Sequence, residues 1–166
     1  MAETKQKQEQ AKVTKAPVKA AASAGKIIVV RVRGRVRLLT TIKNTLDMLR
    51  LYKTNFCVIL DNTPVNMGMI QKAKDYITWG EADSATVEEL FSKRGTEYTG
   101  PLTDTKGKIT YTGRYVEHKG KKYNKYFKLN PPHGGYGRKG IKTHFHMGGA
   151  LGDRAEKISD LVKRML

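Results

Sequence analysis

The histidines and one aspartate are the residues of this chain that come nearest to a metal-binding or catalytic set. The histidines are His118, His133, His144 and His146. No cysteine or carboxylate accompanies them at the spacing of a zinc site, so we predict no metal there. Asp61 follows an apolar run, where α/β enzymes often place a reactive carboxylate, yet the DNTP segment (61–64) is ordinary turn chemistry and no second acid is near. The sequence therefore predicts no cofactor and no enzyme.

A glycine-rich segment, PPHGGYGRKGIKTHFHMGG (131–149), invites comparison with a phosphate-binding loop. Gly135 and Gly140 have the spacing of that motif, but Ile141 stands where it needs lysine, and no Ser or Thr follows in the metal-binding place. We therefore expect no nucleotide site. The glycines would instead let the backbone approach an RNA surface closely. The cations expected on phosphates are Arg138, Lys139 and Lys142.

Two histidines of this segment alternate with an aromatic residue. In a strand, the alternation would place His144 and His146 on one face and turn Phe145 inward. Neutral imidazoles on such a face can form hydrogen bonds with bases or stack on them. We therefore expect a short strand that presents both histidines to RNA.

Positive charge dominates the composition. Lys and Arg number 32 and Asp and Glu 15, which gives a net charge of +17 and a pI near 10.0. Nucleic acid is the commonest partner of such a chain, and an anionic membrane surface is the alternative. No stretch approaches the roughly 18 apolar residues of a spanning helix. Residues 1–26 contain no apolar core of a secretory signal, so we expect a soluble, intracellular protein.

This charge is concentrated in the second half of the chain. Residues 27–95 hold 11 Lys and Arg against seven acids, whereas residues 106–142 hold 11 against Glu117 alone. Aromatic residues are interleaved with these cations, a mixture suited to neutralising phosphates and stacking on unpaired bases. They are Tyr111, Tyr115, Tyr123, Tyr126, Phe127 and Tyr136. We expect an RNA partner, against the alternative of a merely solvated charged face.

Four arginines stand at every second position: Arg31, Arg33, Arg35 and Arg37. If the strand that begins near Ile27 continued through them, they would project from one face as a row of bidentate phosphate donors. The alternative is an open sheet face kept soluble by charge. Lys and Glu would serve equally there, whereas Arg is favoured where RNA is contacted.

Strand and helix patterns alternate along the segment that would position these residues. The expected elements are a strand from residue 27 with one apolar and one cationic face, a helix over 41–52, a buried strand over 55–60, a helix from Pro64 to about Ala73, a strand over 75–79 and a helix over 84–94. Thr40 or Thr41 is placed to cap the first helix, and Thr63 the second. Cys57 is expected to be a small buried hydrophobe without a chemical role.

The second half of the chain has a different pattern of residue types. Strand-like pieces occur over 108–116 and 125–129 among long loops. Asp153 and Glu156 resemble a capping box before a terminal helix, whose apolar side is expected to pack on the core. The residues on that side are Ile158, Leu161, Val162 and Met165. The first 26 residues lack core-forming residues and are expected to be disordered, or helical only on binding.

In this order, the pieces resemble a known family. They are KIIVVRVRGRVR, TLDMLRL, NFCVILDNTPVNMGMIQKAKDYITWGE, LFSKRG, FKLNPPHGGYGRKGIK and GGALGDRAEKISDLVKRML, which together span about residues 26–166. The chain resembles the ribosomal large-subunit protein L-thirty family, in its longer archaeal form, which is related to eukaryotic large-subunit protein L-seven. The segment before Gly25 matches no family motif and lacks the long basic arm of eukaryotic members, which favours an archaeal source.

The resemblance implies an α+β fold. Its βαβαβ core would have a three-stranded, mainly antiparallel, ferredoxin-like sheet with helices on one face, followed by a basic extension with short strands and a terminal helix. We divide the chain into a flexible basic tail (1–25), the core (26–95) and the extension (96–166). The resemblance also implies a non-catalytic constituent of the cytoplasmic large ribosomal subunit. Its expected partners are large-subunit ribosomal RNA and other large-subunit proteins, with no membrane and no small-molecule substrate.

By matching position, the RNA contacts are expected on the first strand and on the extension. The candidates are Arg31, Arg33, Arg35 and Arg37, and then Lys121, Lys122, Tyr123, Lys125, Tyr126, Lys128, His133, Tyr136, Arg138, Lys139, Lys142, His144 and His146. Two alternatives stay open at this point. One is a free RNA chaperone or regulator with the same fold, and the other is an enzyme centred on Asp61 and the histidines.

Overall fold

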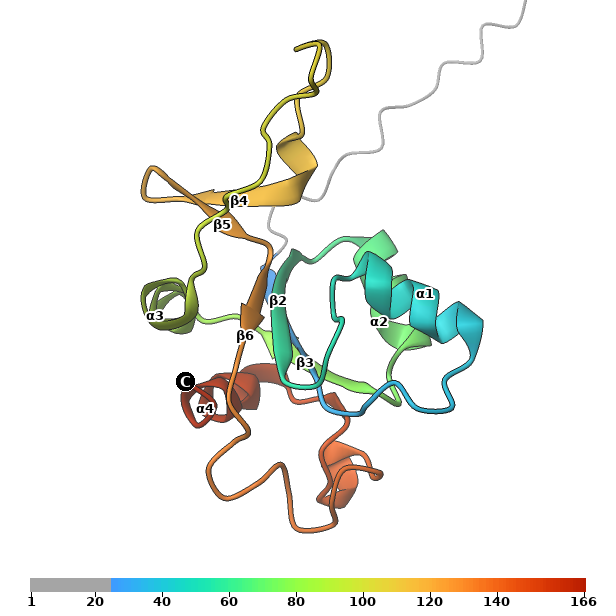
Figure 1. The fold of residues 1–166 in the computed structure, drawn as a ribbon. Helices are drawn as coiled ribbons and strands as arrows, with labels where there is room; N and C mark the ends of the chain where they lie inside the picture. The colour runs from blue at the N-terminus through green and yellow to red at the C-terminus, as the bar shows by residue number, and fades with distance from the viewer. Residues whose placement is uncertain (1–24) are drawn as a thin grey trace, which may run out of the picture.

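A mixed sheet forms the centre of the computed structural model, which describes residues 25–166 (Figure 1). Within these residues the sheet has five strands, in the order β6 (Tyr126–Lys128), β2 (Phe56–Asp61), β1 (Lys26–Arg31), β3 (Ile77–Glu81) and β7 (Gly152–Asp153). β1 runs antiparallel to both neighbours, β6 is antiparallel to β2, and β7 is parallel to β3. The predicted α+β class and three-stranded antiparallel core are thus confirmed, and two extension strands widen the sheet. The predicted flexible tail lies outside the described residues, except for Gly25.

Helices cover both faces of this sheet (Figure 1). They are α1 (Thr40–Met48) and α2 (Pro64–Lys72) on one face, and α3 (Ser84–Arg94) and α4 (Ile158–Lys163) on the other. Ile28 and Val30 pack with α3 and α4, while Ile27 and Val29 pack with α1 and α2. The prediction that the second face of β1 becomes cationic is therefore wrong, because α1 and α2 cover that face and exclude water from it.

The first helix is shorter than predicted. Leu39 occupies its N-cap position without a side-chain hydrogen bond, so neither predicted threonine caps it. The helix ends at Met48 because Arg50 adopts a left-handed conformation with φ of 60°. Arg50 N donates to Asp47 O at 3.0 Å and Leu51 N to Leu46 O at 2.9 Å, which is a Schellman motif with arginine in place of glycine.

The next two helices agree closely with the sequence. α2 begins at Pro64, and the Thr63 hydroxyl accepts a hydrogen bond from Asn66 N at 3.3 Å, as the cap prediction requires. α3 spans Ser84–Arg94, the predicted bounds, and Gly95 follows it. An added Cβ at Gly95 would lie 2.9 Å from the Tyr123 ring, so this glycine permits the extension to pack closely on α3.

The first part of the extension forms a separate hairpin of β4 (Tyr115–His118) and β5 (Lys121–Asn124). The strand predicted over 108–116 is present only at its end, because residues 112–114 form a 3-10 turn. β5 was not predicted, and β6 corresponds to the piece predicted over 125–129.

The terminal helix packs on the core as expected. A 3-10 turn (Ala155–Lys157) precedes α4, and the predicted apolar side is fully buried. The capping box is wrong in detail, since Asp153 Oδ1 accepts from Ala155 N at 2.9 Å and not from Glu156 N. No helix among residues 25–166 is long and apolar enough to cross a membrane.

Candidate nucleic-acid interface

Arg31 lies inside the protein and not on a cationic face. Its side chain is 0% exposed. The guanidinium donates to Arg33 O at 2.8 Å, Leu51 O at 2.5 Å and Gly34 O at 3.0 Å. Burial is the main cause that lowers its pKa below the usual value, and nearby Arg35 adds to this effect. In this structure Arg31 joins two loops to the end of β1 and is not accessible to a phosphate.

The other arginines of the alternating run do not form a row. β1 ends at Arg31, so the condition for a shared strand face is not met. Arg33 donates to Asp75 O at 3.0 Å, and its guanidinium carbon lies 4.8 Å from the centre of the Tyr76 ring. Arg35 binds both carboxylate oxygens of Asp47, at 2.7 and 2.8 Å. Arg37 is exposed and has a left-handed backbone with φ of 55°.

The candidate lysines on β5 and β6 differ in exposure and in the side chains beside them. Lys121 and Lys128 are exposed, and Lys122 and Lys125 are half-buried. Lys121 Nζ lies 3.6 Å from Glu97 Oε1. The ammonium of Lys122 lies 4.9 Å from the centre of the Tyr115 ring.

The tyrosines of these strands are packing residues. Tyr126 stacks on Phe56 with ring centres 5.3 Å apart and planes at 5°. Tyr123 packs beside Phe91, with ring centres 5.4 Å apart. Both tyrosines are half-buried, so their rings are only partly available to a base.

The glycine-rich loop, residues 131–149, carries the largest group of exposed candidates. They are His133, Arg138, Lys139, Lys142 and His146. Tyr136 is half-buried, its hydroxyl donates to Asn55 Oδ1, and burial raises its pKa to about 12. The predicted strand with two histidines on one face is wrong, because residues 145–147 form a 3-10 turn.

His144, just before this turn, lies close to a carboxylate: its Nε2 is 3.7 Å from Asp75 Oδ1. Phe145 is half-buried like His144, so the predicted alternation of an inward Phe145 with outward histidines is not present. The pair of imidazoles is therefore divided between a half-buried position near Asp75 and an exposed one at His146.

Two arginines that were not predicted from the sequence donate hydrogen bonds to the backbone of this loop. Arg154 is 5% exposed and donates to Thr78 Oγ1 at 3.0 Å, Tyr136 O at 3.0 Å and Ala150 O at 3.1 Å. Its guanidinium carbon lies 4.4 Å from the centre of the Phe145 ring. Burial, followed by the positive charge of Arg164, lowers the pKa of Arg154. No spacing in the sequence distinguishes this arginine from an exposed one.

Arg164 supports the first turn of the loop. Its Nη1 donates to His133 O at 3.1 Å and to Gly135 O at 3.2 Å. Gly135 itself has φ of 75°, a conformation that favours glycine. Further along, a Cβ added at Gly137 would lie 2.8 Å from Gly149 O, so the loop backbone at Gly137 packs directly on its last residue. These glycines serve the folding of the loop itself, and their role in approaching RNA stays a prediction.

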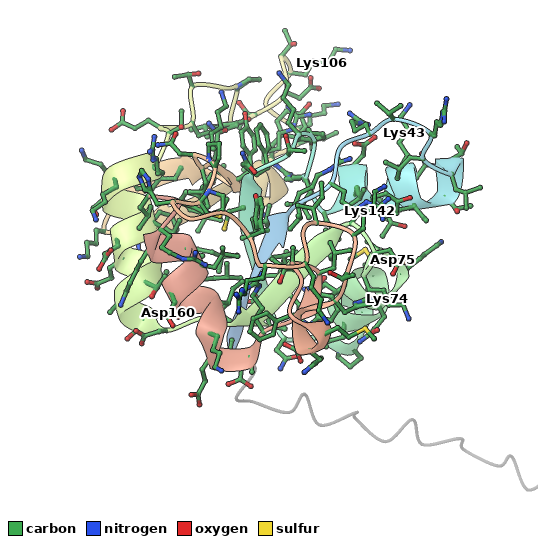
Figure 2. All side chains as sticks on the ribbon, turned by 90° about the horizontal axis from the view of Figure 1, so that it is seen from below. Lys43, Lys74, Asp75, Lys106, Lys142 and Asp160 are labelled. Carbon is green, nitrogen blue, oxygen red and sulfur yellow. The ribbon has the colours of Figure 1, made fainter. Side chains whose placement is uncertain are left out.

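The exposed cations of the loop lie apart from an acidic cleft. Figure 2 shows Lys142 of the loop and Lys74 on the same side, together with Asp75, and Asp160 of α4 on the other side. Lys74, which follows α2, is exposed and was not predicted as a site residue. A cleft lined by Glu81, Asp83 and Glu156 lies at the end of β3, away from the end at which Arg31 meets the loops. The basic loop therefore occupies its own part of the surface.

The residues considered for catalysis are not assembled into a site. No group of three or more possible metal-binding side chains occurs within residues 25–166. The backbone carbonyl of Asp61 accepts hydrogen bonds from Thr63 N and Asn66 Nδ2, both at 2.8 Å, so a turn is present, although the carbonyl and not the Asp61 side chain forms it. His118 stacks on Phe91 with ring centres 4.2 Å apart. Cys57 is buried, as predicted, and burial raises the pKa of its thiol above the usual range.

Comparison with known proteins gives consistent matches. Residues 27–77 match the family described as ribosomal protein L30p/L7e. The chain is 44% identical to large ribosomal subunit protein uL30 of Nanoarchaeum equitans, over 82% of this chain and 96% of that relative. It is 39% identical to the protein of that name from Methanopyrus kandleri, over 81% of this chain and 99% of the relative. The protein of that name from Methanococcus maripaludis is also 39% identical, over 83% and 97%.

Proposed function

The chain belongs to the ribosomal protein L30p/L7e family, and from this premise we propose that it binds large-subunit ribosomal RNA mainly through the glycine-rich loop of residues 131–149. The resemblance found in the sequence, to the long archaeal form, is confirmed by relatives that align over most of the chain. Membership of the family makes the chain a structural protein of the large subunit of the cytoplasmic ribosome and not an enzyme.

The observation that carries the proposal is the unpaired charge of this loop. Residues 131–149 contain no acid. Arg138, Lys139 and Lys142 are exposed, and none of them takes part in an ion pair with another described residue. Cations without a carboxylate partner keep their full charge for phosphates, and they release condensed counterions when RNA binds.

Hydrogen bonds from two arginines to its backbone make the loop suitable for RNA recognition. Arg154 and Arg164 donate to carbonyls at Tyr136, Ala150, His133 and Gly135, so the backbone is held before RNA arrives. A pre-organised surface loses less conformational entropy on binding than a flexible one. The proposal therefore combines free cations with a fixed backbone.

The test is a titration of the full chain with deproteinised large-subunit ribosomal RNA at several salt concentrations. A triple variant, Arg138→Gln with Lys139→Gln and Lys142→Gln, removes three proposed phosphate contacts. The slope of log K against log salt is expected to fall in magnitude by about 2 to 3, since each neutralised phosphate contributes about 0.7 to 0.9. Affinity at low salt should fall as well.

A matched control removes the same charge elsewhere. Lys72, Lys157 and Lys163 lie on α2, in the turn before α4 and on α4, all three are exposed, and the control variant changes each of them to glutamine. This variant should change the slope by less than about 1. An equal loss in both variants would show that only net charge matters, and the loop would then have no special role.

A further inference from the structure

A second element of the extension projects from the molecule. Residues 101–114, here called the arm, form a short hairpin in which Thr103 pairs with Thr110. Tyr111 N donates to Leu102 O at 2.8 Å, and Gly107 N closes the turn on Asp104 O at 2.8 Å. Figure 1 shows the arm extending beyond β4 and β5, away from the five-stranded sheet. The arm is therefore separate from the loop of the proposed RNA site.

One face of the arm carries three apolar or aromatic side chains and a single acid near the tip. In an antiparallel pair, residues opposite each other point to the same side, and every second pair shares that side. Leu102 lies opposite Tyr111, and Ile109 lies opposite Asp104 two pairs along, so these four residues share one face, while Thr103 and Thr110 point to the other. The Asp104 carboxylate accepts a hydrogen bond from Thr105 N at 2.8 Å and so belongs to the turn at the tip. Leu102 is 40% exposed and Ile109 57%. Neither belongs to a core cluster of the described residues, so this face is open for a partner.

The charge of the arm favours a polyanion. It contains Lys106, Lys108 and Arg114 against a single acid, Asp104. The guanidinium carbon of Arg114 lies 3.9 Å from the centre of the Tyr111 ring, which makes a layered cationic and aromatic surface beside the apolar face. Figure 2 shows Lys106 at the periphery of the molecule. A basic protein surface would be repelled by this charge, whereas RNA is attracted by it.

The base of the arm is fixed to the core by Arg50. Its Nη2 donates to Gly113 O at 2.8 Å and its Nη1 to Arg114 O at 3.2 Å. This contact accounts for arginine at a left-handed position where glycine is usual, since glycine has no side chain to make it. Tyr98 also packs on Tyr115 at the base, with ring centres 5.7 Å apart. The direction in which the arm projects is thereby set before binding.

We propose that the arm is a second RNA-binding element, in which the face of Leu102, Ile109 and Tyr111 contacts unpaired bases of large-subunit ribosomal RNA. Lys106 and Lys108 bind the flanking phosphates. Unpaired bases fit this face because every base offers an apolar π-surface for stacking, while the major groove of an RNA duplex is too deep and narrow for a hairpin. The inference rests on the proposed function, since it takes the same RNA as its partner.

The test compares variants of the full chain on deproteinised large-subunit RNA. Tyr111→Thr should weaken binding by about tenfold and leave the salt slope unchanged, because stacking releases no counterions. Lys106→Gln with Lys108→Gln should lower the slope by about 1.4 to 1.8 in magnitude. The control, Thr103→Ser with Thr110→Ser, alters the opposite face and should bind like the wild type. Urea unfolding of each variant, which should match the wild type, verifies that the core is intact.

Chemical probing of the RNA supplies the decisive readout. Nucleotides protected by the wild type should regain reactivity with Tyr111→Thr and stay protected with the threonine control. If Tyr111→Thr binds and protects like the wild type while the triple variant of the loop loses binding, the arm proposal is overturned and the proposed function stands. If the loop variant binds normally and the arm variants do not, the arm proposal stands and the loop proposal fails.

Discussion

Replacing Arg154 by methionine should destabilise the folded protein by about 2 to 4 kcal/mol. The change removes hydrogen bonds to Thr78 Oγ1, Tyr136 O and Ala150 O, each worth about 1 kcal/mol net. It also removes the contact with the Phe145 ring, worth about 1 kcal/mol. Methionine fills a similar volume and avoids the cost of burying a charge, which offsets part of the loss.

The assay is urea unfolding followed by fluorescence. The chain contains one tryptophan, Trp79 on β3, which is 6% exposed and whose carbonyl accepts from Arg154 N at 2.9 Å. With a urea dependence of about 2 kcal/mol per molar, the midpoint should fall by roughly 1 to 2 M. Arg164→Met is the matched control, because its exposed guanidinium also donates to loop carbonyls. It should cost less than about 1 kcal/mol.

The reasoning would be refuted by a loss at Arg154 that is below about 1 kcal/mol or equal to that of the control. Either result would mean that the glycine contacts alone hold the loop. Arg154→Lys provides a further check. A lysine retains the charge but cannot reach three acceptors in a fixed plane, so it should recover only part of the lost stability.

Two further changes test other features. Burial raises the pKa of Tyr136 to about 12, so the unfolded chain loses this phenolic proton near pH 10, before the folded protein does. The free energy of unfolding should fall by up to about 2 kcal/mol between pH 10 and 12. Urea titrations across that range should show a smaller fall for Tyr136→Phe, which has no phenolic proton to lose. Gly80→Ala should destabilise, because the added Cβ would collide with Ala155 O and lie 2.8 Å from Ile158 Cβ. Gly68→Ala, in open space on α2, should instead raise the free energy of unfolding by about 0.5 to 1 kcal/mol, and a loss there would contradict the reasoning.

Local signals accounted for the helices that could be predicted well. The Thr63-Pro64 pair fixes the start of α2 by its own cap and ring geometry, and Gly95 marks the end of α3. Both depend on neighbours in the sequence only. The end of α1 could not be found in this way, because Arg50 holds a left-handed conformation that residue type alone does not suggest.

The site was less predictable because tertiary contacts decide which cations are free. The alternation of arginines in the sequence continues past the end of β1. The strand ends there because Val32 N and Arg33 N both donate to Tyr76 O and bend the chain. Arg31 and Arg154 are bound to carbonyls brought together by folding, and no spacing in the sequence announces this. In loop 131–149 the predicted cations Arg138, Lys139 and Lys142 are exposed, because a glycine-rich segment with several charges has little apolar surface to bury, and their contact with RNA stays a prediction.

The position of loop 131–149 between β6 and β7 bears on the order of events during synthesis. β6 and β7 flank opposite edges of the sheet, so the chain crosses from the β2 edge to the β3 edge through this loop. A nascent chain that has completed β3 lacks the partners of both edges, and it also lacks Arg154 and Arg164, which hold the loop. The basic loop therefore acquires its final shape only after translation passes residue 164, which delays its recognition surface until the whole fold can form.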